Sequence, residues 1–110
     1  MYIILGSGRA GYQAAKHFKD IGRPCTLVDI NPERAESLKD MGFENVVEGD
    51  MASEELLSKL NIAQAKGIAV FTTDMELNLR VARKVREISK EVPIILRAGR
   101  QDAGEEIKGT

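Results

Sequence analysis

Three glycines near the amino terminus have the spacing of a phosphate-binding turn. Gly6, Gly8 and Gly11 form Gly-x-Gly-x-x-Gly directly after the apolar segment Tyr2–Leu5. The first glycine permits a tight turn, the second lets backbone approach a pyrophosphate, and the third lets a helix pack close to the sheet. Phosphates would lie at the N-terminus of that helix, where unpaired N–H groups and the helix dipole favour an anion. The candidate phosphate-binding residues are Gly6, Ser7, Gly8, Arg9, Ala10 and Gly11.

An acidic residue follows these glycines at the distance expected for a ribose-binding carboxylate. Asp29 ends the apolar and β-branched run 25–28, close to the ~20 residues beyond the glycines that a dinucleotide site requires. A carboxylate there would accept hydrogen bonds from the adenosine ribose and repel a 2′-phosphate, which favours NAD(H) over NADP(H). Asp29 could instead begin a turn, because Asp-Ile-Asn-Pro is turn-like in composition. The spacing favours the ribose-binding role, with Ile30 and Asn31 beside it in the site.

Two further loops contain polar residues at the ends of expected strands. Asp50 follows the strand expected at 45–48, so it would leave the sheet at the same edge as Asp29 and could lie near the adenine. Gly49-Asp50 is equally compatible with a simple turn. The apolar run 68–71 has the composition of a strand buried on both faces of a parallel sheet. The candidate site residues in these loops are Asp50, Met51, Thr72, Thr73 and Asp74.

Strand and helix patterns alternate along the chain and would place these loops together. We expect strands at 2–5, 25–28, 45–48, 68–71 and 94–96, and helices at 8–21, 32–41, from 53 to about 60 and at 75–88. Alternation of this kind predicts an α/β, Rossmann-like, doubly wound parallel sheet of five strands in the order 3-2-1-4-5. Too few residues follow Arg100 for a further crossover, so the sixth strand of the full fold is predicted to be missing or truncated.

Length and charge limit the class of protein. A chain of 110 residues with 43% hydrophobic content can bury one modest core, so we expect a single domain over 1–110. A formal net charge of -1 provides no basic field for nucleic acid. No segment approaches the ~18 to 20 apolar residues that would insert into a membrane. The single cysteine, Cys25, agrees with a reducing compartment, and the expected location is cytoplasmic.

The sequence contains no arrangement of residues typical of catalysis or metal binding. His17 is the only histidine and lies among lysines, where an exposed side chain without a chemical role is expected. There is no Gly-x-x-x-x-Gly-Lys-Ser/Thr loop and no Cys/His cluster. A dehydrogenase would also need a second region to hold its substrate. We therefore predict no catalytic residue and no metal site, and interpret the chain as a nucleotide-binding module.

Five segments occur in an order seen in one protein family. They are strand-GSGRAG-helix, Val28-Asp29, Gly49-Asp50, Thr73-Asp74-Met75-Glu76-Leu77-Asn78 and Ile95-Leu96-Arg97-Ala98. The chain resembles the RCK, or TrkA-N, domain over nearly its whole length. Members of that family regulate potassium channels and transporters from the cytosolic side and bind NAD(H) or adenine nucleotides. The resemblance implies that Arg9 faces phosphate, Asp29 the ribose, Asp50 the adenine neighbourhood, and Arg97 the nucleotide or a neighbouring subunit.

The same resemblance bears on ligand, partners and assembly. It implies NAD+ or NADH as the cofactor, with ATP, ADP or AMP as alternatives, and a homodimer or higher oligomer on the cytosolic side of a potassium channel or transporter. Similar domains precede some archaeal DHH-type phosphoesterases, so a sensor domain of such an enzyme is a second hypothesis, and a fragment of an NAD-dependent oxidoreductase is a third. The apolar strand at 94–96 would leave a bare sheet edge, which a partner is expected to cover.

Overall fold

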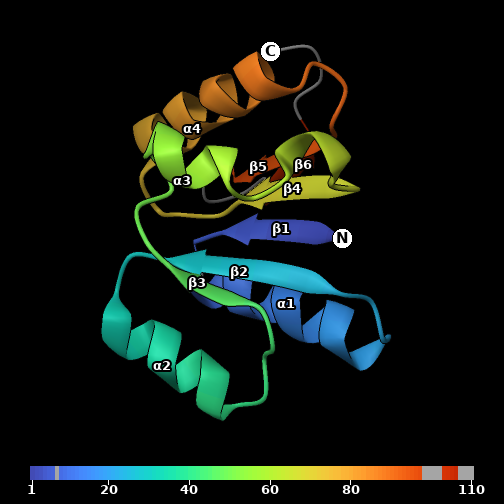
Figure 1. The fold of residues 1–110 in the computed structure, drawn as a ribbon, viewed down its shortest axis with the longest axis vertical. Coiled ribbons are helices and arrows are strands. Elements are labelled where there is room, and N and C mark those ends of the chain that lie inside the picture. Colours follow the sequence, from blue (N-terminus) through green and yellow to red (C-terminus); the bar gives the residue numbers. More distant parts are fainter. Residues whose placement is uncertain (7, 98–102, 107–110) are drawn as a thin grey trace.

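The computed structural model describes residues 1–6, 8–97 and 103–106 and contains a single six-stranded sheet over these residues (Figure 1). Its strands are β1 (Tyr2–Leu5), β2 (Cys25–Asp29), β3 (Val46–Glu48), β4 (Gly67–Val70), β5 (Ile94–Arg97) and β6 (Ala103–Glu106). Its helices are α1 (Arg9–Asp20), α2 (Pro32–Asp40), α3 (Glu54–Ser58) and α4 (Met75–Ile88), with a short 3-10 helix, η1 (Ile62–Gln64).

The strands follow the order β3-β2-β1-β4-β5-β6, with β1 in the interior of the sheet. Tyr2 of β1 aligns with Cys25 of β2 on one side and with Gly67 of β4 on the other, and all pairs from β3 to β5 are parallel. The predicted parallel sheet with the order 3-2-1-4-5 is therefore confirmed. The strand order reverses between β1 and β4, so the carboxyl ends of these strands frame the place where doubly wound sheets bind ligands.

The far edge of the sheet differs from our prediction. β6 pairs antiparallel with β5, with Ile95 opposite Glu106 and Leu96 opposite Glu105. The expectation of a bare apolar edge at β5 was wrong, because β6 covers this edge. β6 is a short antiparallel strand and not the sixth parallel strand of the full doubly wound fold, which the prediction gave as missing or truncated. An antiparallel neighbour needs only a short connection, whereas a parallel one needs a crossover of about a dozen residues or more. The short connection between β5 and β6 is therefore compatible with an antiparallel pair and not with a parallel one.

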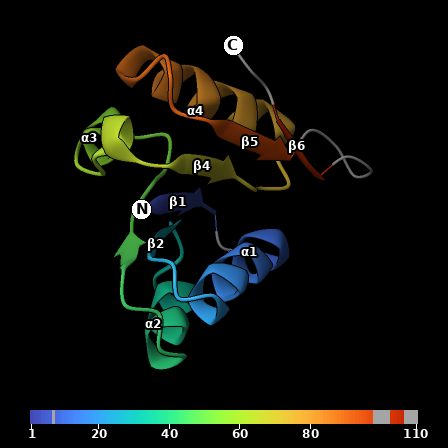
Figure 2. The same ribbon diagram turned by 90° about the vertical axis from the view of Figure 1, so that its right-hand side faces the viewer.

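Two apolar clusters cover the two faces of the sheet. Successive residues of a strand point to opposite faces, so Ile3 and Leu5 pack with Val81 and Val85 of α4, whereas Ile4 packs with Ala15 of α1 on the other side. Figure 2 shows α1 and α2 on one face and α3 and α4 on the other. This two-sided burial explains why β1 and β4 are continuous apolar runs.

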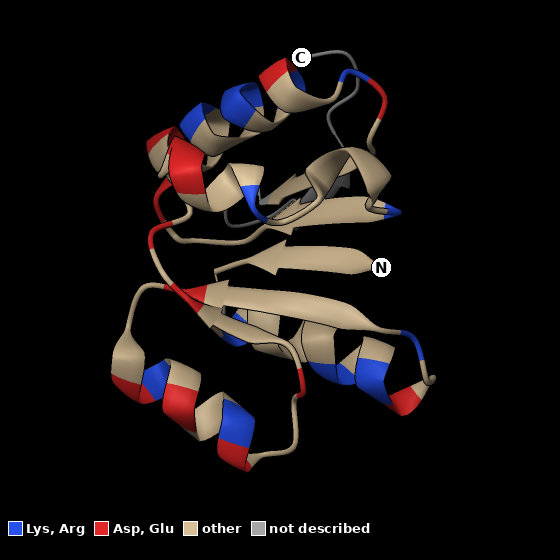
Figure 3. Cartoon of the chain, viewed as in Figure 1, with Lys and Arg blue, Asp and Glu red and all other residues tan. Residues whose placement is uncertain are grey.

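Side-chain caps fix the starts of three helices at the carboxyl edge of the sheet. Asn31 accepts hydrogen bonds from the backbone N–H groups of Glu33 and Arg34 at 2.9 and 3.2 Å, with Pro32 in the first position of α2 as predicted. Ser53 caps α3 and Asp74 caps α4. Figure 3 shows that acidic residues gather at this edge of the molecule. None of the helices in the described part of the chain is long and apolar enough to cross a bilayer.

Candidate functional site

The glycine turn is positioned by contacts with two other loops. Gly6 follows β1 with a φ of +95°, a conformation that residues with a Cβ rarely adopt. A Cβ at this position would lie 3.1 Å from Thr72 Cγ2 and 3.2 Å from Met51 Cε. The backbone N–H of Gly6 donates to Val28 O at 2.8 Å, which ties the turn to β2. Loops after β1, β3 and β4 therefore meet at Gly6.

The other two glycines of the turn are required for different reasons. A Cβ on Gly11 would lie 1.9 Å from the carbonyl oxygen of Gly6, so only glycine lets α1 begin so close to the turn. A Cβ on Gly8 would meet no atom within 4 Å, because the space above this residue is open. Gly8 is the N-cap of α1, and no side chain of the described residues caps this helix. An open, uncapped helix start fits a phosphate group.

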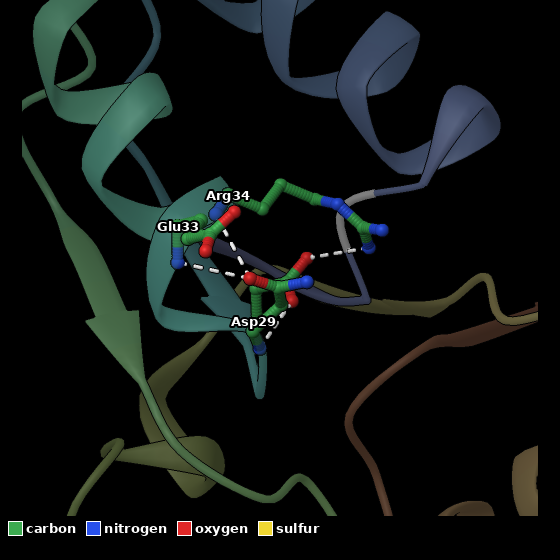
Figure 4. A network of polar contacts seen from close by, with 4 residues as sticks. Asp29, Glu33 and Arg34 are labelled. Carbon is green, nitrogen blue, oxygen red and sulfur yellow. Dashed lines mark hydrogen bonds and ion pairs between the residues drawn. The ribbon is translucent and has the colours of Figure 1, made fainter.

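Asp29 ends β2 with a side chain that is only 3% exposed. Its Oδ1 accepts a hydrogen bond from the backbone N–H of Asn31 at 2.8 Å, so the carboxylate does order the turn into α2. Its Oδ2 accepts a hydrogen bond from Arg34 Nη1 at 3.1 Å (Figure 4). The carboxylate is thus held in one orientation at the sheet edge where a ribose-binding acid is expected.

Sequence reasoning missed Arg34. Its side chain is half exposed and forms an ion pair with Asp29. The Asn31-Pro32 cap could have indicated this contact, because it places Arg34 in the first turn of α2, next to the end of β2. In Figure 4 the guanidinium reaches from α2 toward the start of α1. A cation therefore contacts the candidate ribose-binding carboxylate.

The β4–α4 loop is held by a buried asparagine, to which the sequence analysis gave no role beyond its place in the segment 73–78. Asn78 is 1% exposed. Its Nδ2 donates to Thr72 O at 3.0 Å, and its Oδ1 accepts from Thr72 N at 3.2 Å, so one side chain pairs with both backbone groups of the loop residue. The Thr72 hydroxyl accepts from Asp74 N at 3.1 Å. A lone asparagine among the apolar positions of an expected helix was the available indicator.

The β3–α3 loop has the turn conformation that we considered for Gly49-Asp50. Asp50 is exposed, and its Oδ1 accepts from Ala52 N at 2.8 Å. Met51 is buried against the glycine turn. Lys84 Nζ donates to Ala52 O at 2.6 Å, which connects this loop to α4. The contact of the Asp50 side chain is thus that of a simple turn. The loop that contains it nevertheless packs on the glycine turn through Met51.

The remaining predicted residues fall at the same edge or outside the described part of the chain. Arg9 and Ile30 are exposed, and Ile30 is 63% exposed beside Asp29. Ala10 is half-buried in the first turn of α1, and Thr73 is exposed. Ser7 lies outside the described residues, as does the side chain of Arg97, whose backbone ends β5. Among the described residues, no group of three or more His, Cys, Asp or Glu could hold a metal ion.

The opposite edge of the sheet contains a cavity of about 340 Å³ lined by Lys19, Arg23, Cys25 and Phe43, among others. Burial raises the pKa of the Cys25 thiol, which disfavours the reactive thiolate. The cavity also includes Gly22 and Gly42, which follow α1 and α2. Helix C-termini are unfavourable for anions. A phosphate ligand is therefore better accommodated at the carboxyl edge.

Comparison with known proteins gives a consistent family. The model of the TrkA-N domain matches residues 2–109. A Trk system potassium uptake protein TrkA homolog from Pyrococcus abyssi is 29% identical over 112 residues, which cover 98% of this chain and 49% of the relative. Potassium channel protein 1 from Methanocaldococcus jannaschii is 32% identical over 100 residues, covering 88% of this chain and 29% of the relative. The chain thus spans at most about half the length of these relatives.

Solved structures share the fold. The NAD(P)-binding domain of an exopolyphosphatase-related protein from Archaeoglobus fulgidus has a TM-score of 0.80 and 28% identity, covering 86% of this chain and 70% of that chain. The GsuK channel bound to NAD has a TM-score of 0.77 and 21% identity, covering 86% of this chain and 17% of the channel chain. At this identity the second likeness shows the fold alone.

Proposed function

The chain belongs to the TrkA-N domain family, and from that membership we propose that residues 1–110 form one regulatory domain that binds NAD(H) or an adenine nucleotide. The observation that supports this most directly is the uncapped start of α1, with open space above Gly8, at the point where the strand order reverses. Backbone N–H groups and the helix dipole favour an anion there.

The proposed ligand lies across the carboxyl edge of the sheet. The glycine turn and Arg9 bind its phosphates, and Asp29 accepts hydrogen bonds from a ribose. Ile30, which is 63% exposed beside Asp29, offers an apolar surface to the adenine ring. Asp50, Met51 and the loop 72–74 complete the surrounding wall. NAD+, NADH, ATP, ADP and AMP share the groups that these residues would contact.

The proposed role is control of potassium transport from the cytosolic side of a channel or transporter, by a homodimer or higher oligomer. The relatives named as a potassium uptake protein and a potassium channel protein support this. A second candidate is the sensor domain of a phosphoesterase, favoured by the likeness to an exopolyphosphatase-related protein at 28% identity. The domain itself performs no turnover in either case.

Isothermal titration with NADH, NAD+, ATP, ADP and AMP tests the binding function. We expect saturable binding of at least one of these nucleotides, and the absence of any binding heat in folded protein would overturn the proposal. NADH absorbance should stay constant when hydroxy or keto acids are added. Steady NADH oxidation would contradict the non-enzymatic role. Potassium uptake by cells with and without the full protein separates the two candidate roles.

A further inference from the structure

The carboxylate that would bind ribose has a cation beside it. Arg34 Nη1 lies 3.1 Å from Asp29 Oδ2, and the Arg34 side chain is half exposed while that of Asp29 is 3% exposed. Within the described part of the chain, Asp29 is the one acidic partner of this guanidinium. An arginine has five N–H donors in a planar fork, so most of them face away from this single contact.

The Arg34–Asp29 ion pair changes the net charge that a 2′-phosphate would meet at the end of β2. A lone Asp29 carboxylate would repel a 2′-phosphate. Paired with Arg34, its charge is compensated, and the exposed part of the guanidinium can form charge-assisted hydrogen bonds with phosphate oxygens. Figure 4 shows Arg34 reaching from α2 past Asp29 toward the start of α1. Because the proposed nucleotide extends from the glycine turn to Asp29, its adenosine ribose would bind next to this guanidinium.

On the basis of the proposed function, we propose that Arg34 is a specificity-determining residue that lets the site accept an adenosine carrying a 2′-phosphate. The domain then binds NADPH and 2′,5′-ADP in addition to NADH. The discrimination expected from Asp29 alone is reduced, because the same arginine that neutralises the carboxylate also binds the added phosphate.

The residues around Arg34 are mostly acidic, so replacing Arg34 should affect the binding of a 2′-phosphate strongly. Glu33 precedes it on α2, and Glu48 aligns with Asp29 on the neighbouring strand β3. Asp50 lies in the loop after β3, and Arg9 is the first residue of α1. Without Arg34, a 2′-phosphate would meet a sheet edge that is mainly acidic. A neutral replacement should therefore exclude the 2′-phosphate while a plain ribose still binds.

Titration calorimetry of the whole chain with NADH, NADPH, 5′-ADP and 2′,5′-ADP tests this. We expect the unmodified protein to bind NADPH within about tenfold of NADH, and the two ligands to displace each other. Arg34→Gln should weaken NADPH and 2′,5′-ADP by roughly 10- to 100-fold, the range for losing hydrogen bonds between charged groups. NADH should change by less than about threefold, because its ribose needs only Asp29. Arg23→Gln removes the same charge at the opposite end of β2 and should alter neither ligand.

The outcomes separate the two proposals. If NADH binds and NADPH does not, the role of Arg34 is overturned and the nucleotide-binding function stands. If neither NADH nor 5′-ADP binds, the proposed function itself fails. If Arg34→Gln weakens NADH and NADPH equally in protein with an unchanged thermal unfolding midpoint, Arg34 only orients Asp29, and the proposed specificity is wrong.

Discussion

At the scale of single residues, Gly8 and Gly11 separate ligand binding from folding. Gly8→Val places a branched side chain in the open space where phosphate would approach, and its Cβ would meet no atom within 4 Å. We expect nucleotide binding to be lost while the free energy of unfolding changes little. Gly11→Ala is the matched control, since its Cβ would lie 1.9 Å from Gly6 O. This clash should lower the free energy of unfolding by about 1 to 3 kcal/mol.

Calorimetry and urea denaturation of both glycine variants check this pair. A folded Gly8→Val protein that still binds NADH would remove the glycine turn from the site. A Gly11→Ala protein as stable as the unmodified chain would show that α1 can move away from the turn without cost.

Asp29→Ala should weaken NADH binding by roughly 1 to 3 kcal/mol, the range for lost hydrogen bonds to a charged acceptor. Stability should fall as well, because the carboxylate also holds the Asn31 N–H and the Arg34 guanidinium. Asp40→Ala is the comparison, since it removes an exposed carboxylate from the last turn of α2, away from the proposed site. Affinities are compared below the unfolding transition of each variant. Unchanged NADH affinity in Asp29→Ala would contradict the ribose-binding role.

At the scale of elements, the β4–α4 loop depends on one buried side chain. Asn78→Ala removes both contacts to the Thr72 backbone and should lower the free energy of unfolding by about 1 to 3 kcal/mol, the cost of unsatisfied buried groups. Asp74→Ala removes the cap of the same helix and should cost about 1 kcal/mol. Urea denaturation measures both. An Asn78→Ala protein more stable than Asp74→Ala would show that the loop does not need this clamp.

Most elements could be predicted because local chemistry marks their ends. Helix starts are indicated by capping residues, which are Asn31 before Pro32, Ser53 and Asp74. The apolar runs of β1 and β4 indicate buried parallel strands. β6 could not be predicted, because Ala-Gly-Glu-Glu has no strand pattern and its pairing depends on β5. The roles of Arg34 and Asn78 were missed because they depend on residues brought near by folding. The candidate site residues could be proposed because they follow the ends of expected strands, and their contacts with a ligand stay predictions.

At the scale of the whole molecule, the β5 edge of the sheet is no longer the expected dimer interface. β6 covers the β5 edge, so a dimer formed by sheet extension there is not expected. We predict a homodimer that uses helical surfaces, where α4 exposes Met75 and Leu79 at 45% and 39%. Light scattering should give a dimer mass with NADH, and Leu79→Glu should weaken the dimer without weakening NADH binding. A monomer at micromolar concentration, unchanged by NADH, would contradict this.

The contact of three loops at Gly6 has a mechanical consequence. Met51 and Thr72 both pack where a Cβ of Gly6 would lie, while Lys84 and Asn78 connect these loops to α4. Close-packed contacts shift between discrete arrangements more readily than they stretch. We therefore expect the glycine turn, both neighbouring loops and α4 to shift together when a ligand moves the turn. Reversing a 1:99 ratio between two arrangements of these elements requires about 5.5 kcal/mol of preferential binding. Only a ligand that binds one arrangement much more tightly than the other can therefore switch the domain.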